Sequence, residues 1–270
     1  MDNYFPTRTH WVKNEGKCFK RRSSLWRSKR AVPSSFRIAR SLLSRIENEN
    51  TGEILLEELN TEIPSYRIEE TKNLISILGN EVVEEFPWKN GMKPSTSDNV
   101  EGVLRRTWRP ALSIVGSDGM PSTANAGNVL RPYTTLQLSM RIPPMVNPKK
   151  AVSAIEKVLK NNVPYGASVD LEFEEAAEGW NAPKSKTWLL NAIEKASKEY
   201  FNQMPCTIGE GGTIPFMAML GKQFPEAQFV ITGVLGPQSN AHGPNEFLHI
   251  PFAKKLTCCI SSIITDFKQN

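Results

Sequence analysis

The apolar positions between residues 111 and 173 alternate between strand-like and helix-like spacing. Residues 111–115 form a short apolar run typical of a strand. Residues 135–142 alternate apolar with polar side chains, which predicts a strand with one buried face. Residues 149–161 repeat apolar side chains at helical spacing, and residues 167–173 alternate again. The predicted order is strand, strand, helix, strand.

Two further helices are predicted ahead of these elements. Residues 32–49 have a helical apolar face, with Ser34 or Ser35 as the N-cap. Residues 69–78 predict a helix that ends at Gly79. The side chains that we place on the apolar face of the first helix are Phe36, Ala39, Leu42, Leu43 and Ile46. The first helix and the later elements together indicate an antiparallel sheet with two helices on one face.

The C-terminal block, residues 184–270, combines several helical patterns with a single strand pattern. Residues 187–201, 212–224 and 250–267 predict helices, and residues 228–235 (QFVITGVL) predict a buried strand. A parallel sheet needs several strands that are buried on both faces, so the block is interpreted as half of an α/β domain. The side chains that we expect in an exposed apolar patch there are Val230, Leu235, Ile263 and Ile264.

The composition places the chain among globular proteins, with a fold class of α/β (α+β). Of its 270 residues, 39% are hydrophobic, and no apolar run approaches the roughly 18 residues of a membrane helix. The net charge of +5 arises in residues 1–30, which carry nine Lys and Arg against two acids. That segment has a charge of +7, so the other 240 residues sum to −2 and do not indicate a nucleic-acid-binding protein.

Residues 1–31 show neither helical nor strand periodicity. We interpret them as a disordered basic tail; a mitochondrial or plastid transit peptide and a nucleic-acid-binding arm are the alternatives. The start has no apolar core like that of a secretory signal. The four cysteines, Cys18, Cys206, Cys258 and Cys259, have no metal-type spacing. A reduced, cytoplasmic location is therefore predicted.

Three motifs carry the candidate chemistry. Asn128 precedes an alternating strand that ends at Arg141. Residues 209–216 read GEGGTIPF, and residues 239–246 read SNAHGPNE. In this order the motifs resemble the family-20 metallopeptidases, the di-zinc amidohydrolases that include carnosinases, aminoacylases and glutamate carboxypeptidases.

The resemblance implies a division into domains. Residues 32–183 correspond to the family's ferredoxin-like lid, or dimerisation domain, and residues 184–270 to the C-terminal part of the catalytic domain. Residues 1–31 do not match the family's preceding segment. The resemblance also implies a homodimer formed through the lid, a small peptide or acyl-amino-acid substrate, and no membrane partner.

The resemblance assigns roles to five residues. His242 matches the last of five ligands that hold two zinc ions in the family; the other four ligands and the general base lie in a part that this sequence does not match. Gly212 and Thr213 match the turn that contacts the substrate carboxylate. Asn128 and Arg141 match lid residues that reach the substrate. The guanidinium of an arginine can bind a carboxylate through two hydrogen bonds.

Each assignment has an ordinary structural alternative. A lone loop histidine is often structural, the Gly211-Gly212 turn can be a plain capped helix start, and Arg141 can be a surface residue. A nucleotide-binding loop is excluded because no Gly-Lys-Ser/Thr follows the glycines. A Ser239–His242 nucleophilic pair lacks an orienting acid.

Two functions from different classes remain. The first is a zinc peptidase of dipeptides or N-acyl amino acids that is inactive as this chain alone, because the metal-ligand half is unmatched. The second is a non-catalytic dimerisation module built on the lid.

Overall fold

The computed structural model of the chain describes most of residues 31–268. The described ranges are 2–3, 23–24, 31–84, 86, 88–174, 176, 179–210, 215–236, 239–241 and 243–268. The predicted basic tail lies outside the described residues except for two short strands. These are β1 (Asp2–Asn3), parallel to β6 (Gly209–Glu210), and β2 (Ser23–Ser24), antiparallel to β4 (Val129–Leu130).

The chain folds as two units. Of the described residues, unit 1 contains those within 2–3, 63–106 and 181–268, and unit 2 contains those within 23–24, 31–62 and 107–180. Residues 63–106 therefore group with the C-terminal block and not with the rest of the predicted lid. The reason is their core, in which Leu74, Val82 and Val103 pack together with Ile208. The functional division into lid and catalytic part stays a prediction.

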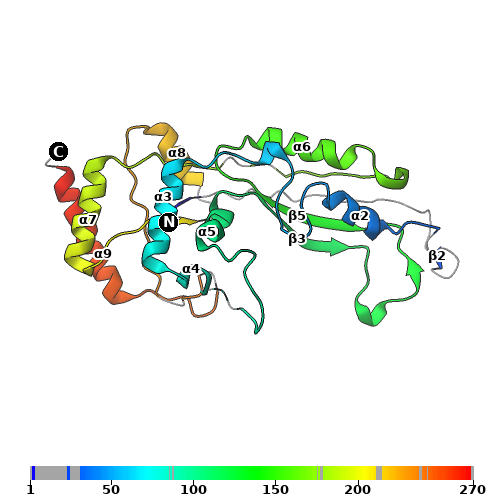
Figure 1. Ribbon diagram of the computed structural model, residues 1–270, viewed down its shortest axis with the longest axis horizontal. Coiled ribbons are helices and arrows are strands. Elements are labelled where there is room, and N and C mark those ends of the chain that lie inside the picture. Colours follow the sequence, from blue (N-terminus) through cyan, green and yellow to red (C-terminus); the bar gives the residue numbers. More distant parts are fainter. Residues whose placement is uncertain are drawn as a thin grey trace. The chain divides into compact units, whose positions relative to one another are not determined.

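The larger described sheet of unit 2 is an antiparallel pair of strands (Figure 1). Strand β3 (Ala111–Asp118) pairs with β5 (Thr135–Arg141), and the register places Ala111 opposite Arg141 and Asp118 opposite Thr135. The register shifts between Ile114 and Gly116. Alternation in β5 buries Leu136, Leu138 and Met140, as the sequence pattern predicts.

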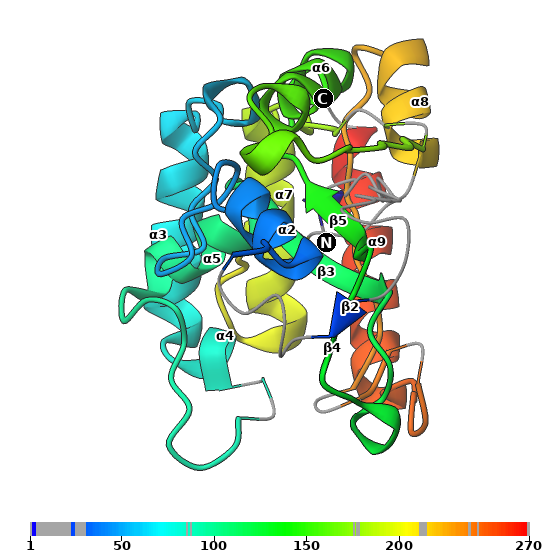
Figure 2. The same ribbon diagram turned by 90° about the vertical axis from the view of Figure 1, so that its right-hand side faces the viewer.

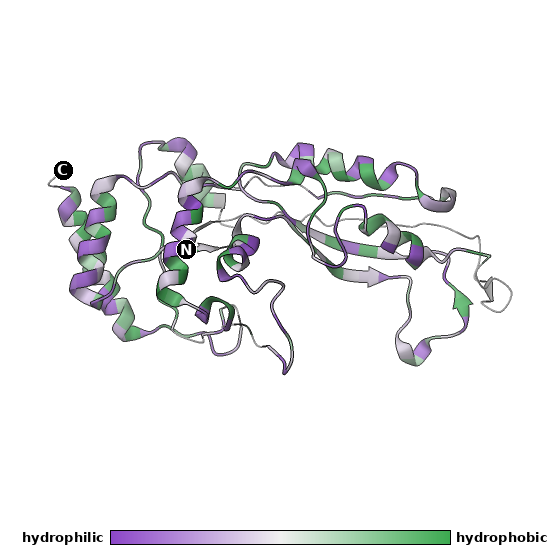
Figure 3. Ribbon diagram, viewed as in Figure 1, coloured by the Kyte–Doolittle hydropathy of each residue, from purple (hydrophilic) through white to green (hydrophobic). Residues whose placement is uncertain are grey.

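Two helices share one core with the buried face of β5. They are α2 (Ser35–Leu43), capped by the Ser34 hydroxyl, and α6 (Pro148–Lys160), capped by the Asn147 side chain. In Figure 3 these helices carry both green and purple residues, as expected of amphipathic helices. Two short 3-10 helices, η1 (Glu57–Leu59) and η3 (Pro164–Gly166), complete the elements around this core, and η2 (Thr123–Asn125) precedes β4.

The apolar face predicted for residues 32–49 needs one correction. Phe36 is 45% exposed, and Ile38 is buried instead. The helix is also shorter than predicted, ending at Leu43, yet Ile46 is completely buried beyond its end.

The strand predicted over residues 167–173 is wrong for residues 167–172, which form no strand. The alternating apolar side chains still face the protein interior, because Val169, Leu171 and Phe173 pack against the core of unit 2. The pattern identified the buried side chains correctly, but not the backbone pairing. Mixed α and β structure, with a small antiparallel sheet, confirms the predicted fold class.

Unit 1 is mainly helical among its described residues. Its strands are the short parallel pair β1 and β6, and its helices are coloured cyan to red in Figure 2. The helices are α3 (Ser65–Leu78), α4 (Glu81–Glu84), α5 (Asn99–Thr107), α7 (Thr187–Phe201), α8 (Pro215–Gln223) and α9 (Ile250–Phe267). None of the described helices is long and apolar enough to cross a membrane.

Helices α7 and α9 lie side by side (Figure 1). Leu189, Ala192 and Ala196 of α7 pack against Cys259 and Ile263 of α9. The small alanines allow the two helices to approach closely. A Lys195–Asp266 ion pair at 3.0 Å joins the same two helices, and the rings of Trp188 and Phe267 pack at a tilt of 43°.

The buried strand predicted over residues 228–235 is wrong. Residues 228–234 belong to no strand, and Leu235 forms one isolated bridge to Leu248. Val230 is 41% exposed and Leu235 42% exposed, because no described strand pairs with this run. Ile264 is also exposed (55%), whereas Ile263 is buried against α7, and the predicted patch as one continuous surface stays a prediction.

Candidate functional site

The loop between residues 234 and 249 carries the last of the three motifs. Its two ends form a short antiparallel neck, in which the His249 N–H donates to the Val234 carbonyl at 3.0 Å and the Gly236 N–H donates to the Phe247 carbonyl at 3.3 Å. The isolated bridge between Leu235 and Leu248 lies between these bonds. The neck therefore fixes where the loop leaves and rejoins unit 1.

Side-chain hydrogen bonds close the loop beyond the neck. The Ser239 hydroxyl accepts from the Phe247 N–H at 2.9 Å and donates to the Phe247 carbonyl at 3.3 Å. The Asn240 amide donates to the Pro244 carbonyl at 3.1 Å. The Gly243 N–H donates to the Asn240 carbonyl at 3.0 Å, which brings these two residues together.

Two glycines of this loop are required by close packing. A Cβ atom at Gly236 would lie 1.9 Å from the Phe247 ring, and one at Gly243 would lie 2.4 Å from the Asn240 amide nitrogen. Neither distance allows a side chain without movement of the neighbour. The glycines of the motif thus permit the folding of the loop, in addition to leaving space around a ligand.

Three of the predicted site residues, Gly212, Thr213 and His242, lie outside the described residues. The segment with Gly212 and Thr213 is flanked by β6 and by the first turn of α8. A helix that begins directly after a glycine turn offers free backbone N–H groups to an anion. The predicted roles of these three residues stay predictions.

Asn128 and Arg141 both belong to unit 2 and are exposed. Asn128 lies in a tight turn, in which the Val129 N–H donates to the Gly127 carbonyl at 2.8 Å. Arg141 is the last residue of β5, and Figure 2 shows β4 well away from the arrowhead of β5. The fold of unit 2 therefore does not gather these two residues at one point.

The described residues do not by themselves fit a zinc site. No group of three or more His, Cys, Asp or Glu side chains gathers among them. Zinc sites in proteins normally use three or four such ligands. Burial also raises the pKa values of the Cys206 and Cys259 thiols, which disfavours the thiolate form that binds metal.

One functional-looking residue has a structural role that the motif analysis missed. His249 is the N-cap of α9, and its Nδ1 accepts from the Phe252 N–H at 3.1 Å. Pro251 lies in the first turn of α9, where proline is favoured, so the sequence indicated the start of the helix. Histidine is not a common capping residue, so the cap itself was not indicated.

Comparisons with known proteins agree on one class. No family model matches the sequence. The structure superposes on human carnosine dipeptidase 1 (TM-score 0.65, 16% identity) over 100% of this chain and 56% of that one. It superposes equally widely on the dipeptidase Dug1p of Saccharomyces cerevisiae (TM-score 0.67, 16% identity, 100% and 56%). The M20 family metallo-carboxypeptidase Sso-CP2 of Sulfolobus solfataricus gives a TM-score of 0.69 at 15% identity, over 97% and 59%.

The chain thus has the α/β fold of the family M20, or family-20, metallopeptidases, and the predicted resemblance is confirmed. A curated relative is the cysteinylglycine-S-conjugate dipeptidase of Corynebacterium striatum. It is 26% identical over 152 residues, which are 54% of this chain and 33% of the relative. The chain spans a third of that relative's length and 56% to 59% of the three solved structures.

Proposed function

We propose that this chain provides the lid and the carboxylate-binding part of a zinc peptidase that acts on dipeptides or N-acyl amino acids. The observation that carries the proposal is the superposition of the whole chain on two dipeptidases. The sequence similarity to a third dipeptidase supports it independently.

The substrate carboxylate is the group that the proposed residues recognise. Arg141, at the end of β5, supplies a guanidinium that can donate two parallel hydrogen bonds to a carboxylate. Thr213 and the backbone N–H of Gly212 precede α8, where the positive end of the helix dipole favours an anion. Asn128, which unit 2 does not bring to Arg141, contributes an amide donor to another part of the substrate.

In this proposal His242 is the zinc ligand that the chain provides. A neutral imidazole is a good zinc donor, and zinc when bound polarises the scissile carbonyl and lowers the pKa of a water molecule. The resemblance matches only this one of the family's five ligands. We therefore propose that the chain alone does not hydrolyse its substrate, and that it binds zinc weakly.

A hydrolysis assay tests this proposal. The purified chain is incubated with zinc and with a panel of dipeptides and N-acetyl amino acids, and the released amines are quantified. We expect no turnover above a blank that lacks protein. Robust, chelator-sensitive turnover by the pure chain would refute the inactivity, while leaving the family assignment in place.

The second candidate function is a dimerisation module, and unit 2 carries the observation that favours it. Strand β3 exposes Ile114 (54%) and Val115 (55%), two apolar side chains on a sheet that has two strands among the described residues. Such an edge can pair with a second copy of the chain. Sedimentation equilibrium is the test: a dimer that Val115→Lys dissociates supports the module, and a monomer at all concentrations argues against it.

A cytoplasmic location accompanies the proposal. Cys206, Cys258 and Cys259 are free thiols in the structure, and free thiols persist in reducing compartments. Localisation of a fluorescent fusion tests it, and an organellar signal would contradict it.

A further inference from the structure

The hydroxyl of Ser239 binds both backbone groups of one residue on the opposite side of the loop. Its oxygen accepts from the Phe247 N–H at 2.9 Å, and its hydrogen is donated to the Phe247 carbonyl at 3.3 Å. A residue in an antiparallel ladder makes the same two bonds with a backbone partner. The Ser239 N–H also donates to the Gly236 carbonyl at 3.0 Å, so a backbone bond and the hydroxyl together hold Ser239 at the end of the neck.

This attachment of Ser239 divides the loop into two parts. The neck consists of residues 234–236 and 247–249. If it were the only anchor, the ten residues 237–246 would be fixed only at their two ends. The hydroxyl of Ser239, together with its N–H bond to the Gly236 carbonyl, reduces the segment between fixed points to residues 240–246, and only the hydroxyl ties Ser239 to Phe247 across the loop. Within that segment, the Asn240 amide and the Gly243 N–H form the inner turn.

We propose that Ser239 is the positioning residue of this loop. Its hydroxyl fixes the residues that precede and follow position 242. The link between this inference and zinc or substrate rests on the proposed function, because only that function uses His242. The positioning of the loop by Ser239 does not depend on the proposed function. The bonds that hold the segment in place come from the described residues Ser239, Asn240 and Phe247.

A comparison of Ser239→Ala with Ser239→Thr isolates the hydroxyl. Alanine removes both bonds to Phe247, and threonine keeps a hydroxyl that can make them. The whole chain is used without added metal or substrate. Two readouts are recorded by NMR: the exchange rate of the Phe247 amide, and the side-chain signal of the His242 imidazole.

His249 serves as an internal control in the same spectra. Its imidazole caps α9 through the Phe252 N–H and lies on the other side of the neck from Ser239. A change confined to the loop leaves its signal in place. A general loss of structure moves it together with His242.

The expected result for Ser239→Ala is an exchange rate at the Phe247 amide that is higher by about tenfold, since one hydrogen bond contributes up to that factor. The His242 signal shifts and broadens, and the His249 signal does not. Ser239→Thr restores both readouts. Three results would each overturn the proposal: an unchanged His242 signal in Ser239→Ala, an equal change at His249, or no restoration by threonine.

The outcome of this NMR comparison can be distinguished from the outcome of the hydrolysis assay and from that of a measurement of peptide binding to the chain. Loss of positioning in Ser239→Ala supports the inference even if the chain proves to bind no peptide. An unchanged spectrum removes the positioning role even if carboxylate binding is demonstrated.

Discussion

At the scale of single residues, Arg45 shows how one side chain joins two elements of unit 2. Its guanidinium donates to the carbonyls of Val158 (3.2 Å), Asn161 (2.6 Å) and Asn162 (2.8 Å), at the C-terminal end of α6. These carbonyls have no partners within a helix, and they lie at the negative end of its dipole. A cation with several donors satisfies both requirements.

Arg45→Met is expected to lower the free energy of unfolding of the chain by about 2 kcal/mol, because it leaves several carbonyls without their charged donor. Arg45→Lys should lose less, since it keeps the charge but not the fork of donors. Arg40→Met, at an exposed position on α2, is the matched control and should cost no more than about 0.5 kcal/mol. Urea unfolding measures all three; equal losses at positions 40 and 45 would contradict the role of Arg45.

Gly236 offers a second test at this scale. Alanine there places a Cβ atom against the Phe247 ring, whereas alanine at Gly127 meets no atom within 4 Å. We expect Gly236→Ala to displace the ring and to raise amide exchange in residues 239–247 by about tenfold. Gly127→Ala should leave exchange in this loop unchanged. If both variants exchange like the parent chain, the close packing at Gly236 is not important for the loop.

The residue scale also shows what the sequence could not predict at the candidate site. The motif identified the segment and His242 from residues 239–246 alone. The hydroxyl contact of Ser239 depends on the return of the chain at Phe247, and no local pattern encodes that return. The position of His242 itself lies outside the described residues.

At the scale of elements, helices were predictable from the sequence and strands only in part. The helix patterns at 187–201 and 250–267 agree with α7 and α9, because a helix satisfies its own backbone hydrogen bonds. The patterns at 167–173 and 228–235 have the side chains of strands. A strand also needs a neighbour, and the described structure provides none for 167–172 or 228–234.

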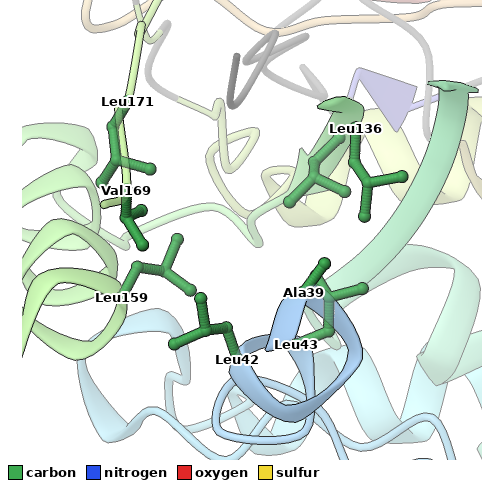
Figure 4. A pocket seen from close by; sticks show the side chains of 8 residues that line it. Ala39, Leu42, Leu43, Leu136, Leu159, Val169 and Leu171 are labelled. Carbon is green, nitrogen blue, oxygen red and sulfur yellow. The ribbon is translucent and has the colours of Figure 1, made fainter. Parts of the chain in front are cut away.

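The interface between α2, α6 and β5 is incompletely filled. Figure 4 shows apolar side chains around a cavity of about 20 Å³. The lining residues are Ala39, Leu42, Leu43, Leu136, Leu138, Leu159, Val169 and Leu171. Val169 and Leu171, which line this cavity, come from residues 167–172, a segment that covers the core without forming a strand.

Substitutions at this cavity should change stability in opposite directions. Leu42→Ala enlarges it and is expected to cost about 3 kcal/mol, and Val169→Ile adds one methylene and should gain up to about 1 kcal/mol. Phe36→Ala, at a side chain that is 45% exposed, is the control and should cost less than Leu42→Ala. Thermal unfolding measures the series. A loss of stability in Val169→Ile would show that the cavity is too small to fill.

At the scale of the whole molecule, the two units have different kinds of apolar surface. Among the described residues, unit 2 has a large core formed by strand β5 and two helices. The described residues of unit 1 form two separate cores, and Phe216, Leu248, Ile250 and Ile264 are each more than half exposed. Apolar side chains that are exposed in a contiguous patch mark interfaces, whereas single ones are ordinary.

The most direct test of the account is calorimetric binding of a dipeptide to the purified chain, compared with the same dipeptide amidated at its C-terminus. The account predicts that the free carboxylate binds at least tenfold more tightly. It also predicts that Arg141→Met removes most of this preference, whereas Arg131→Met does not. Equal affinity for the two ligands, or a preference that survives in Arg141→Met, would contradict the claim that this chain recognises a substrate carboxylate.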